Sequence, residues 1–136
     1  MRLTTAPAAL AAAVLGLALT SCGGQDRPGP EDQVRTVLST FASAAERRDY
    51  RTICDDVFAP KLLKGLQAIG LPCEVAMRNS LGSVRNPRLS VGRIDVKGPT
   101  ATAEVRTSAD GQQPSTDTVR LDRLKGKWKI SALGDR

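Results

Sequence analysis

The sequence contains no histidine and few aromatic residues: Phe41, Tyr50, Phe58 and Trp128. Without histidine, every serine or cysteine triad that uses an imidazole base is excluded. The scarcity of aromatics means that the core must be built from Leu, Val, Ile and Ala. No phosphate-binding loop, dinucleotide fingerprint or zinc motif occurs. We therefore expect the protein to hold neither a metal nor a cofactor.

The apolar run from Ala8 to Leu19 is too short to cross a bilayer, which takes roughly 20 residues. Arg2 precedes this run and small residues follow it, an order typical of a secretory signal. The signal ends in Leu19-Thr20-Ser21-Cys22, an aliphatic residue and two small residues before a cysteine. This segment resembles the lipobox of bacterial lipoproteins. The alternative is an ordinary signal with a chance cysteine.

The lipobox resemblance implies that the thiol of Cys22 takes a diacylglycerol and that a peptidase cuts just before it. Two acyl chains suffice for stable anchoring, where a single chain is marginal. Residues 23–30 read GGQDRPGP, a Gly- and Pro-rich stretch typical of a flexible tether. We expect a signal peptide over residues 1–21, a lipidated tether over 22–30 and one extracytoplasmic domain over 31–136. The protein would then be lipid-anchored on the outer face of the cell membrane.

The net charge of +6 is spread along the chain. A basic balance can favour an anionic membrane surface or a wall polymer. However, no run of Lys and Arg is interleaved with aromatics, and nucleic acid is not expected outside the cell. We interpret most of the basic residues as solvated surface and predict no nucleic-acid partner.

With Cys22 assigned to the lipid, Cys54 and Cys73 remain. Two cysteines in an exported domain predict a disulfide, and closing this loop would stabilise the fold by about 3 kcal/mol. A metal site is the weaker alternative, because two thiolates alone rarely hold zinc. A redox pair would need Cys-x-x-Cys spacing, which is absent.

Four helices are predicted in the first half of the domain. Val34, Leu38, Phe41 and Ala45 recur at helical spacing, which indicates a helix over residues 31–48. Asp49 has the position of an N-cap for a short second helix that runs through Val57. The third helix is predicted over 60–70, with Leu62, Leu63, Leu66 and Ile69 on its apolar face, and the fourth over 73–81.

From Asn86 onward the apolar period changes to two, as in β-strands. Leu89 and Val91 alternate, and Ile94 and Val96 alternate one step out of phase, so a β-bulge is predicted at Gly92. Further strands are indicated at 101–105, 119–121 and 128–133. Helices followed by strands with short connections predict an α+β fold, with the N-terminal helices packed on a curved antiparallel four-stranded sheet.

Two stretches carry a family resemblance: residues 41–50, FASAAERRDY, and residues 126–130, GKWKI. With the helix-then-sheet order, they resemble the nuclear transport factor 2-like superfamily, the cone-shaped fold of ketosteroid isomerases and polyketide cyclases. The resemblance covers about residues 31–133. The paired cysteines are similar to those of small lipoproteins with this fold from high-GC bacteria. The missing histidine excludes the His-dependent dehydratases of the fold.

The isomerase-type members combine a carboxylate base with an oxyanion site of tyrosine and a protonated aspartate. Tyr50 is the only tyrosine here. We interpret its ring as half-buried with a hydrated hydroxyl, and Trp128 as a core side chain. Both remain candidates for the wall of a pocket.

Five carboxylates lie near Tyr50 in sequence or on the predicted strands, namely Asp55, Asp56, Asp95, Glu104 and Asp117. We interpret Asp55 and Asp56 as a solvated helix end and Glu104 as part of an outer strand face. The five carboxylates do not assemble an acid, a base and oxyanion donors in the sequence. We therefore assign no catalytic residue and do not expect an enzyme.

Three functions stay open. The first is a non-enzymatic binding or accessory lipoprotein whose sheet and helices enclose a small apolar ligand. The second is a module that docks onto another protein of the cell envelope, which would need an exposed apolar patch. The third is a degenerate isomerase- or cyclase-like enzyme, which would need a carboxylate near Tyr50.

Overall fold

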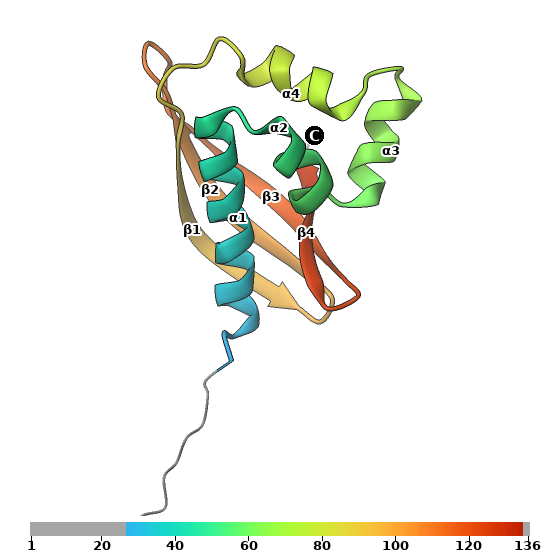
Figure 1. The fold of residues 1–136 in the computed structure, drawn as a ribbon. Coiled ribbons are helices and arrows are strands. Elements are labelled where there is room, and N and C mark those ends of the chain that lie inside the picture. The colour runs from blue at the N-terminus through green and yellow to red at the C-terminus, as the bar shows by residue number, and fades with distance from the viewer. Residues whose placement is uncertain (1–26, 135–136) are drawn as a thin grey trace, which may run out of the picture.

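Helices precede strands throughout the computed structural model, which describes residues 27–134 (Figure 1). The helical half consists of α1 (Pro30–Arg47), α2 (Tyr50–Thr52), a single π-helical turn η1 (Ile53–Val57), α3 (Pro60–Ala68) and α4 (Cys73–Leu81). The sheet consists of β1 (Arg88–Lys97), β2 (Thr100–Ser108), β3 (Ser115–Leu124) and β4 (Lys127–Leu133). None of the helices in this part of the chain is long and apolar enough to span a bilayer.

The long helix α1 begins and ends where local chemistry dictates. Pro30 occupies its first turn, where a missing N–H costs nothing, and Glu31 and Asp32 complement the positive end of the helix dipole. Arg48 ends the helix in the left-handed conformation, with φ 58°. Along its buried face, Val34 and Leu38 are fully inaccessible to solvent.

Asp49 caps the next helical segment, as predicted. Its carboxylate accepts hydrogen bonds from the backbone N–H and the hydroxyl of Thr52, at 3.1 and 2.8 Å. The short α2 then widens into η1, which buries Ile53 and Val57. The segment ends at Phe58, which forms a parallel bridge with Ile130 and so extends the edge of β4.

The arm formed by α3 and α4 packs more loosely than predicted. Among the described helices, α3 is the one with no fully buried residue. Ile69 is 75% exposed, so its predicted place on the apolar face of this helix is wrong. The reason is that α3 ends at Ala68, and Ile69 lies in the turn that leads to Gly70, which has φ 71°.

The four strands form one antiparallel sheet in the order β1-β2-β3-β4, so the predicted α+β fold is confirmed. The predicted bulge lies between Val91 and Ile94. Glycine suits it, because a Cβ at position 92 would lie 3.0 Å from Oε1 of Glu104. The bulge restores Ile94 and Val96 to the face of Leu89 and Val91, which keeps that face apolar.

The helix α1 lies over one face of the sheet, here called the inner face, while α3 contacts the edge strand β4 and α4 packs on α2 and α3 (Figure 1). The core lies between the helices and the inner face, and the buried residues among those described fall within positions 34–131. The largest fully buried side chains come from both layers: Phe58, Leu38, Ile53, Leu121, Ile130, Val34 and Val57. Residues 27–134 thus share one hydrophobic core.

Candidate ligand-binding cleft

Two neighbouring hollows lie between α1 and the inner face of the sheet. The first, of about 250 Å³, is lined mainly by apolar side chains from α1 and all four strands: Leu38, Phe41, Leu89, Val105, Val119, Ile130 and Leu133. The second, of about 320 Å³, extends toward the loops at residues 84–88 and 109–113. Phe41, Leu89 and Thr107 line both hollows. We call the two together the α1–sheet cleft.

The alternation of strand residues places these side chains in the cleft. In the register of the sheet, Leu89 pairs with Thr107, and Thr107 pairs with Ser115. Side chains that are directly opposite project to the same face. The floor is therefore a cross-strand row, and Phe41 of α1 covers it while stacking on Phe58 at a centroid distance of 6.1 Å.

One end of the cleft carries a short chain of hydrogen bonds. The hydroxyls of Thr107 and Ser115 are 2.9 Å apart, and the Ser115 hydroxyl donates to Oδ2 of Asp117 at 3.0 Å. Asp117 alternates with Val119 and Leu121 and lines the first hollow. It is the only carboxylate that the described strands place on the inner face. The cleft thus combines apolar walls with one carboxylate, that of Asp117, which can accept a hydrogen bond.

The predicted pocket residues Tyr50 and Trp128 lie outside this cleft. Tyr50 is 8% exposed, and its hydroxyl is buried without a hydrogen-bond partner among the described residues. The predicted half-buried ring with a hydrated hydroxyl is therefore wrong, because α2 packs it under α4 and α1. Trp128 is 3% exposed, in keeping with a core side chain, and it lines a separate hollow beside α1.

The structure disperses the other candidate carboxylates. Asp55 forms an exposed pair with Arg51 at 3.5 Å, and Asp95 one with Arg93 at 3.3 Å. Asp56 is exposed on η1, and Glu104 projects from the outer face of β2. No cluster of three metal-ligating side chains occurs within residues 27–134. Of the candidates, Asp117 alone reaches the cleft.

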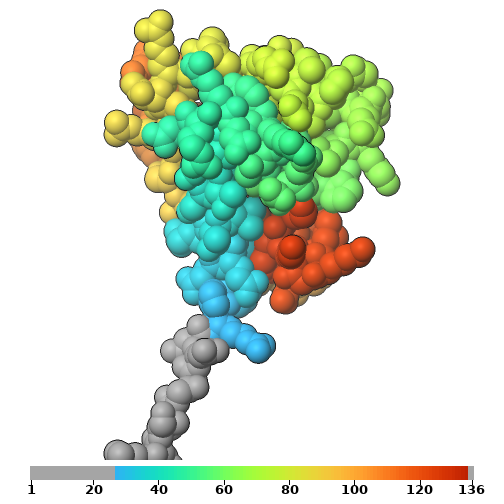
Figure 2. All heavy atoms as spheres, viewed as in Figure 1, coloured from blue at the N-terminus to red at the C-terminus, as the bar shows by residue number. Residues whose placement is uncertain are grey.

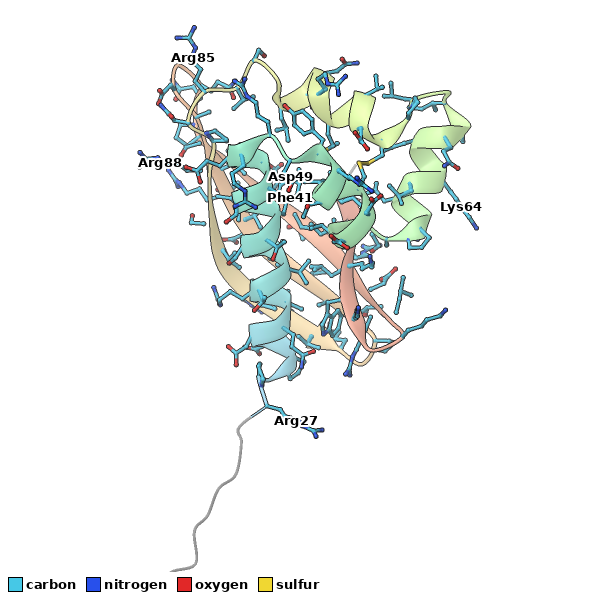
Figure 3. All side chains as sticks on the ribbon, in the orientation of Figure 1. Arg27, Phe41, Asp49, Lys64, Arg85 and Arg88 are labelled. Carbon is cyan, nitrogen blue, oxygen red and sulfur yellow. A yellow bond between two sulfur atoms is a disulfide. The ribbon has the colours of Figure 1, made fainter. Side chains whose placement is uncertain are left out.

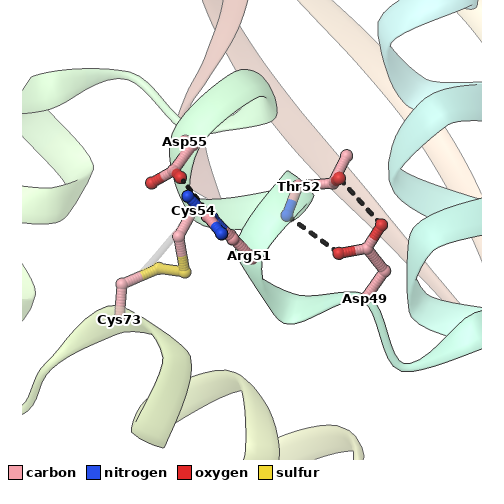
Figure 4. The surroundings of a disulfide bond; sticks show 6 residues. All are labelled: Asp49, Arg51, Thr52, Cys54, Asp55 and Cys73. Atoms are coloured by element: carbon pink, nitrogen blue, oxygen red, sulfur yellow. Dashed lines mark hydrogen bonds and ion pairs between the residues drawn. A yellow bond between two sulfur atoms is a disulfide. The ribbon is translucent and has the colours of Figure 1, made fainter.

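The cysteines Cys54 and Cys73 lie at disulfide distance, with their sulfur atoms 1.99 Å apart (Figure 4). They join η1 to the first residue of α4. Cys54 is 5% exposed, so the link sits at the edge of the core. The predicted lipid-bearing Cys22 and the signal lie outside the described residues.

The fold alters the protonation of Asp49. The hydroxyl of Thr52 and then its backbone N–H donate to the carboxylate and hold the pKa of Asp49 below its ordinary value. Arg47 and Arg51 act weakly in the same direction, and partial burial opposes them. Asp49 lies outside the cleft, so this shift concerns the stability of the helix start.

The comparisons with known proteins identify the fold. No protein-family model and no curated protein matches the sequence. An NTF2-like protein of unknown function from Shewanella baltica superposes with a TM-score of 0.57 at 19% identity, over 76% of this chain and 89% of that one. A candidate dehydratase of the NTF2-like family from Streptomyces avermitilis superposes with a TM-score of 0.55 at 16% identity, over 76% of this chain and 92% of that one.

A designed protein with the NTF2 fold also superposes, at a TM-score of 0.52 and 14% identity, over 76% and 84% of the two chains. The chain therefore has an NTF2-like fold. At these identities the likeness defines the architecture alone, and this fold hosts isomerases and dehydratases as well as proteins of unknown function.

Sequence reasoning placed the candidate pocket at Tyr50 and Trp128, and it placed Asp117 on a strand without assigning it to a face of the sheet. The third strand was predicted only from Val119, whereas β3 begins at Ser115. Extending the period-two pattern backward from Leu121 and Val119 would have placed Asp117 on the inner face. The polar residues before Val119 concealed that continuation.

Proposed function

We propose that the protein is a membrane-anchored extracytoplasmic lipoprotein whose domain binds a small amphipathic molecule in the α1–sheet cleft. The single observation that carries this proposal is Asp117, which lines the first hollow together with Thr107 and a set of apolar side chains. The ligand would place its apolar part against Leu89, Val105 and Val119. It would direct a hydrogen-bond donor, such as an amine or hydroxyl, toward Asp117.

The size and lining of the cleft support a small ligand. Sites for small molecules usually measure about 300–1,000 Å³ and combine apolar walls with a few placed polar groups. The two hollows, of about 250 and 320 Å³, together fall within that range. The Ser115 hydroxyl, which is itself paired with the Thr107 hydroxyl, donates to Asp117, and this reduces the side-chain freedom that binding would otherwise have to remove.

Binding without catalysis is the function we favour. Asp117 and Arg88 are the titratable side chains among the described residues that line the two hollows, and they belong to different hollows. Isomerases of this fold combine a carboxylate base with an oxyanion site that contains a tyrosine. Tyr50 is buried outside the cleft, so that combination is not assembled there.

Native mass spectrometry tests the ligand proposal. Residues 25–136 would be exported into an oxidising compartment, purified gently and weighed before and after denaturation. We expect a mass excess that disappears on denaturation. A bare mass under these conditions, together with no binding of the octyl probes described in the Discussion, would contradict the proposal.

A pair of threonine variants on β2 provides the matched control. Thr107 lines both hollows, whereas Thr102 lies an odd number of residues away and projects from the opposite face. Thr107→Phe should fill the cleft and remove the mass excess. Thr102→Phe adds the same ring to the outer face and should leave it unchanged. Equal effects of both variants would disfavour the cleft as the binding site.

The anchor is tested separately. Cys22→Ala should release the protein from the membrane fraction or stall its processing, because the thiol that takes the lipid is gone. Metabolic labelling with a radioactive fatty acid measures this directly. Unchanged labelling of the variant would overturn the anchoring.

A docking module of the cell envelope is the second candidate. It is favoured by the α3–α4 arm, on which Ile69 is 75% exposed and Val75 is 39% exposed. Crosslinking from a photoreactive residue at position 69 in intact cells tests it. A discrete crosslinked protein that disappears with Ile69→Asp would support docking through this arm.

A further inference from the structure

The β3–β4 hairpin lies at the end of the domain from which the chain leads back to Cys22. Pro28 and Gln33 line one shallow hollow together with Gly126 and Lys127 of the hairpin turn. In the space-filling view the red surface of the hairpin and β4 lies beside the blue start of α1 (Figure 2). Eight residues from Cys22 to Gly29 reach at most about 28 Å. A bilayer that holds Cys22 is therefore within reach of this hairpin.

The hairpin is strongly basic. From Arg123 to Lys129 the sequence reads RLKGKWK, with a cation at every second position and no carboxylate. Arg123, Lys125 and Lys127 are exposed. The neighbouring β1–β2 turn adds the exposed Lys97 and is joined to the hairpin, because the N–H of Arg123 donates to the carbonyl of Pro99 at 2.7 Å.

Carboxylates at this end lie outside the segment from Arg123 to Lys129, and one of them, Asp56 of η1, lines the same hollow as Lys127. Glu31 and Asp32 lie in the first turn of α1, where they complement the helix dipole. Asp122 faces Thr100 on the outer face of the sheet and is only partly exposed. The tip of the hairpin is thus a local concentration of positive charge.

An exposed leucine sits among these cations. Leu124 is 39% exposed and pairs with Lys127 across the turn. Lysine and arginine bind lipid phosphates, while an aliphatic side chain enters the boundary between head groups and acyl chains. An anionic wall polymer would pair with the cations but has no apolar phase in which the leucine could be buried. The combination therefore favours a lipid surface.

The turn itself contains a residue that the backbone disfavours. Lys125 has φ 49° and Gly126 has φ 79°, so both central residues of this two-residue turn are left-handed. Asparagine or glycine is strongly preferred at the first of these positions. Lysine is strained there, and what it adds over asparagine is its charge.

We propose that the β3–β4 hairpin is a second membrane contact. Leu124 enters the interface of the bilayer, and Arg123, Lys125 and Lys127 bind the phosphates of anionic lipids. This inference rests on the proposed anchoring at Cys22. The second hollow of the cleft is built on the β2–β3 loop, at the opposite end of β3, so the contact would direct the opening of the cleft away from the membrane.

Vesicle binding by the unlipidated protein tests the contact. Residues 22–136 carrying Cys22→Ser would be mixed with phosphatidylcholine vesicles with and without phosphatidylglycerol, and bound protein measured by flotation. We expect binding only with phosphatidylglycerol, weakened by salt. Lys125→Asn with Lys127→Gln should reduce partitioning about 25-fold, which is about fivefold for each charge removed.

The matched control removes two exposed cations elsewhere, with Lys64→Gln and Arg85→Gln. Lys64 lies on α3, and Arg85 lies at the opposite end of the domain from Arg27 (Figure 3). We expect partitioning within about twofold of the parent. A loss equal to that of the hairpin variant would show that only net charge matters and would overturn the proposal.

Two further readouts separate the remaining outcomes. Leu124→Ala should weaken vesicle binding severalfold. If this variant bound vesicles as well as the parent, and if the protein bound a soluble polyanion such as polyphosphate equally well, the partner would be an anionic wall polymer and not the membrane. The thermal midpoint of the hairpin variant should not fall, since asparagine suits position 125 better, so lost binding is not unfolding. None of these variants touches the cleft, and the assay needs no acylation, so its result is independent of both parts of the proposed function.

Discussion

Asp117 lies directly opposite Val105 in the β2–β3 register, so a carboxylate occupies the same inner-face row as a valine that is 3% exposed. Apolar residues continue this face on one side, at Val119 and Leu121, and hydroxyls continue it on the other, at Ser115 and Thr107. Along β3 the inner face therefore changes from apolar to polar. For this reason the hollow under α1 suits an amphipathic molecule, with an apolar part and a polar part.

Replacing this carboxylate should stabilise the domain while weakening function. We expect Asp117→Leu to raise the free energy of unfolding in urea by about 0.5–1 kcal/mol, because the apolar walls of the cleft can then close on a leucine. Asp122→Leu, on the outer face, should bring no such gain. A loss of stability with Asp117→Leu would mean that the carboxylate supports the fold.

The preference of the cleft for one ligand head group over another should depend on Asp117. Octylamine and octanoate share an apolar chain and differ in the charge of the head group. We expect the protein to bind octylamine more tightly, because the ammonium can donate to Asp117. Asp117→Asn should remove the preference without abolishing binding of the chain. Isothermal titration calorimetry measures both, and a preference for octanoate would contradict the assigned orientation.

Loss of the bond between Cys54 and Cys73 should be costly. The two residues are 19 apart in sequence, and closing a loop of that size stabilises by about 3 kcal/mol in the chain-entropy picture. The double variant with alanine at both positions should lose about that amount in urea unfolding. Reductant should lower the stability of the parent similarly and leave the variant unchanged. If free-thiol labelling modified both cysteines in unreduced protein, no bond would be present.

Trp128 is expected to act as a core residue. It is 3% exposed, and its indole N–H has no partner among the described residues, so its contribution comes from packing alone. Trp128→Ala should cost about 3–5 kcal/mol in chemical unfolding. Trp128→Phe keeps an aromatic ring and should cost less. Near-parental stability of the alanine variant would show that the ring does not support the core.

Asp49 should contribute to stability in a pH-dependent way. Its folded pKa lies below the ordinary value, so the stabilisation is fully present above the unfolded pKa and is lost as the pH falls through the folded pKa. Asp49→Ala should therefore destabilise at pH 7, and the difference from the parent should shrink in acid. Thermal melts from pH 7 to pH 2 measure this, and a difference independent of pH would contradict the capping role.

The sequence alone determined the order and type of the elements, because that information is local. The spacing of Val34, Leu38 and Phe41 indicated the first helix. Asp49 indicated the start of the second helix, and the change of alternation at Gly92 indicated the bulge in β1. Such patterns depend on neighbouring residues and on the period of the backbone. The NTF2-like architecture was expected from a family resemblance carried by residues 41–50 and 126–130 together with this order of elements.

Only the tertiary structure decided which side chains meet. The local pattern did not assign Asp117 to a face of the sheet, and the pairing of β3 with β2 as far as Thr107 places Ser115 and Asp117 on the inner face. Tyr50 was a candidate site residue because of its phenol group, yet the packing of α2 buried its hydroxyl. Ile69 continued an apolar pattern, but α3 ended one residue too early to bury it. Register and burial are set by contacts between distant segments, and a pattern of neighbours cannot specify those.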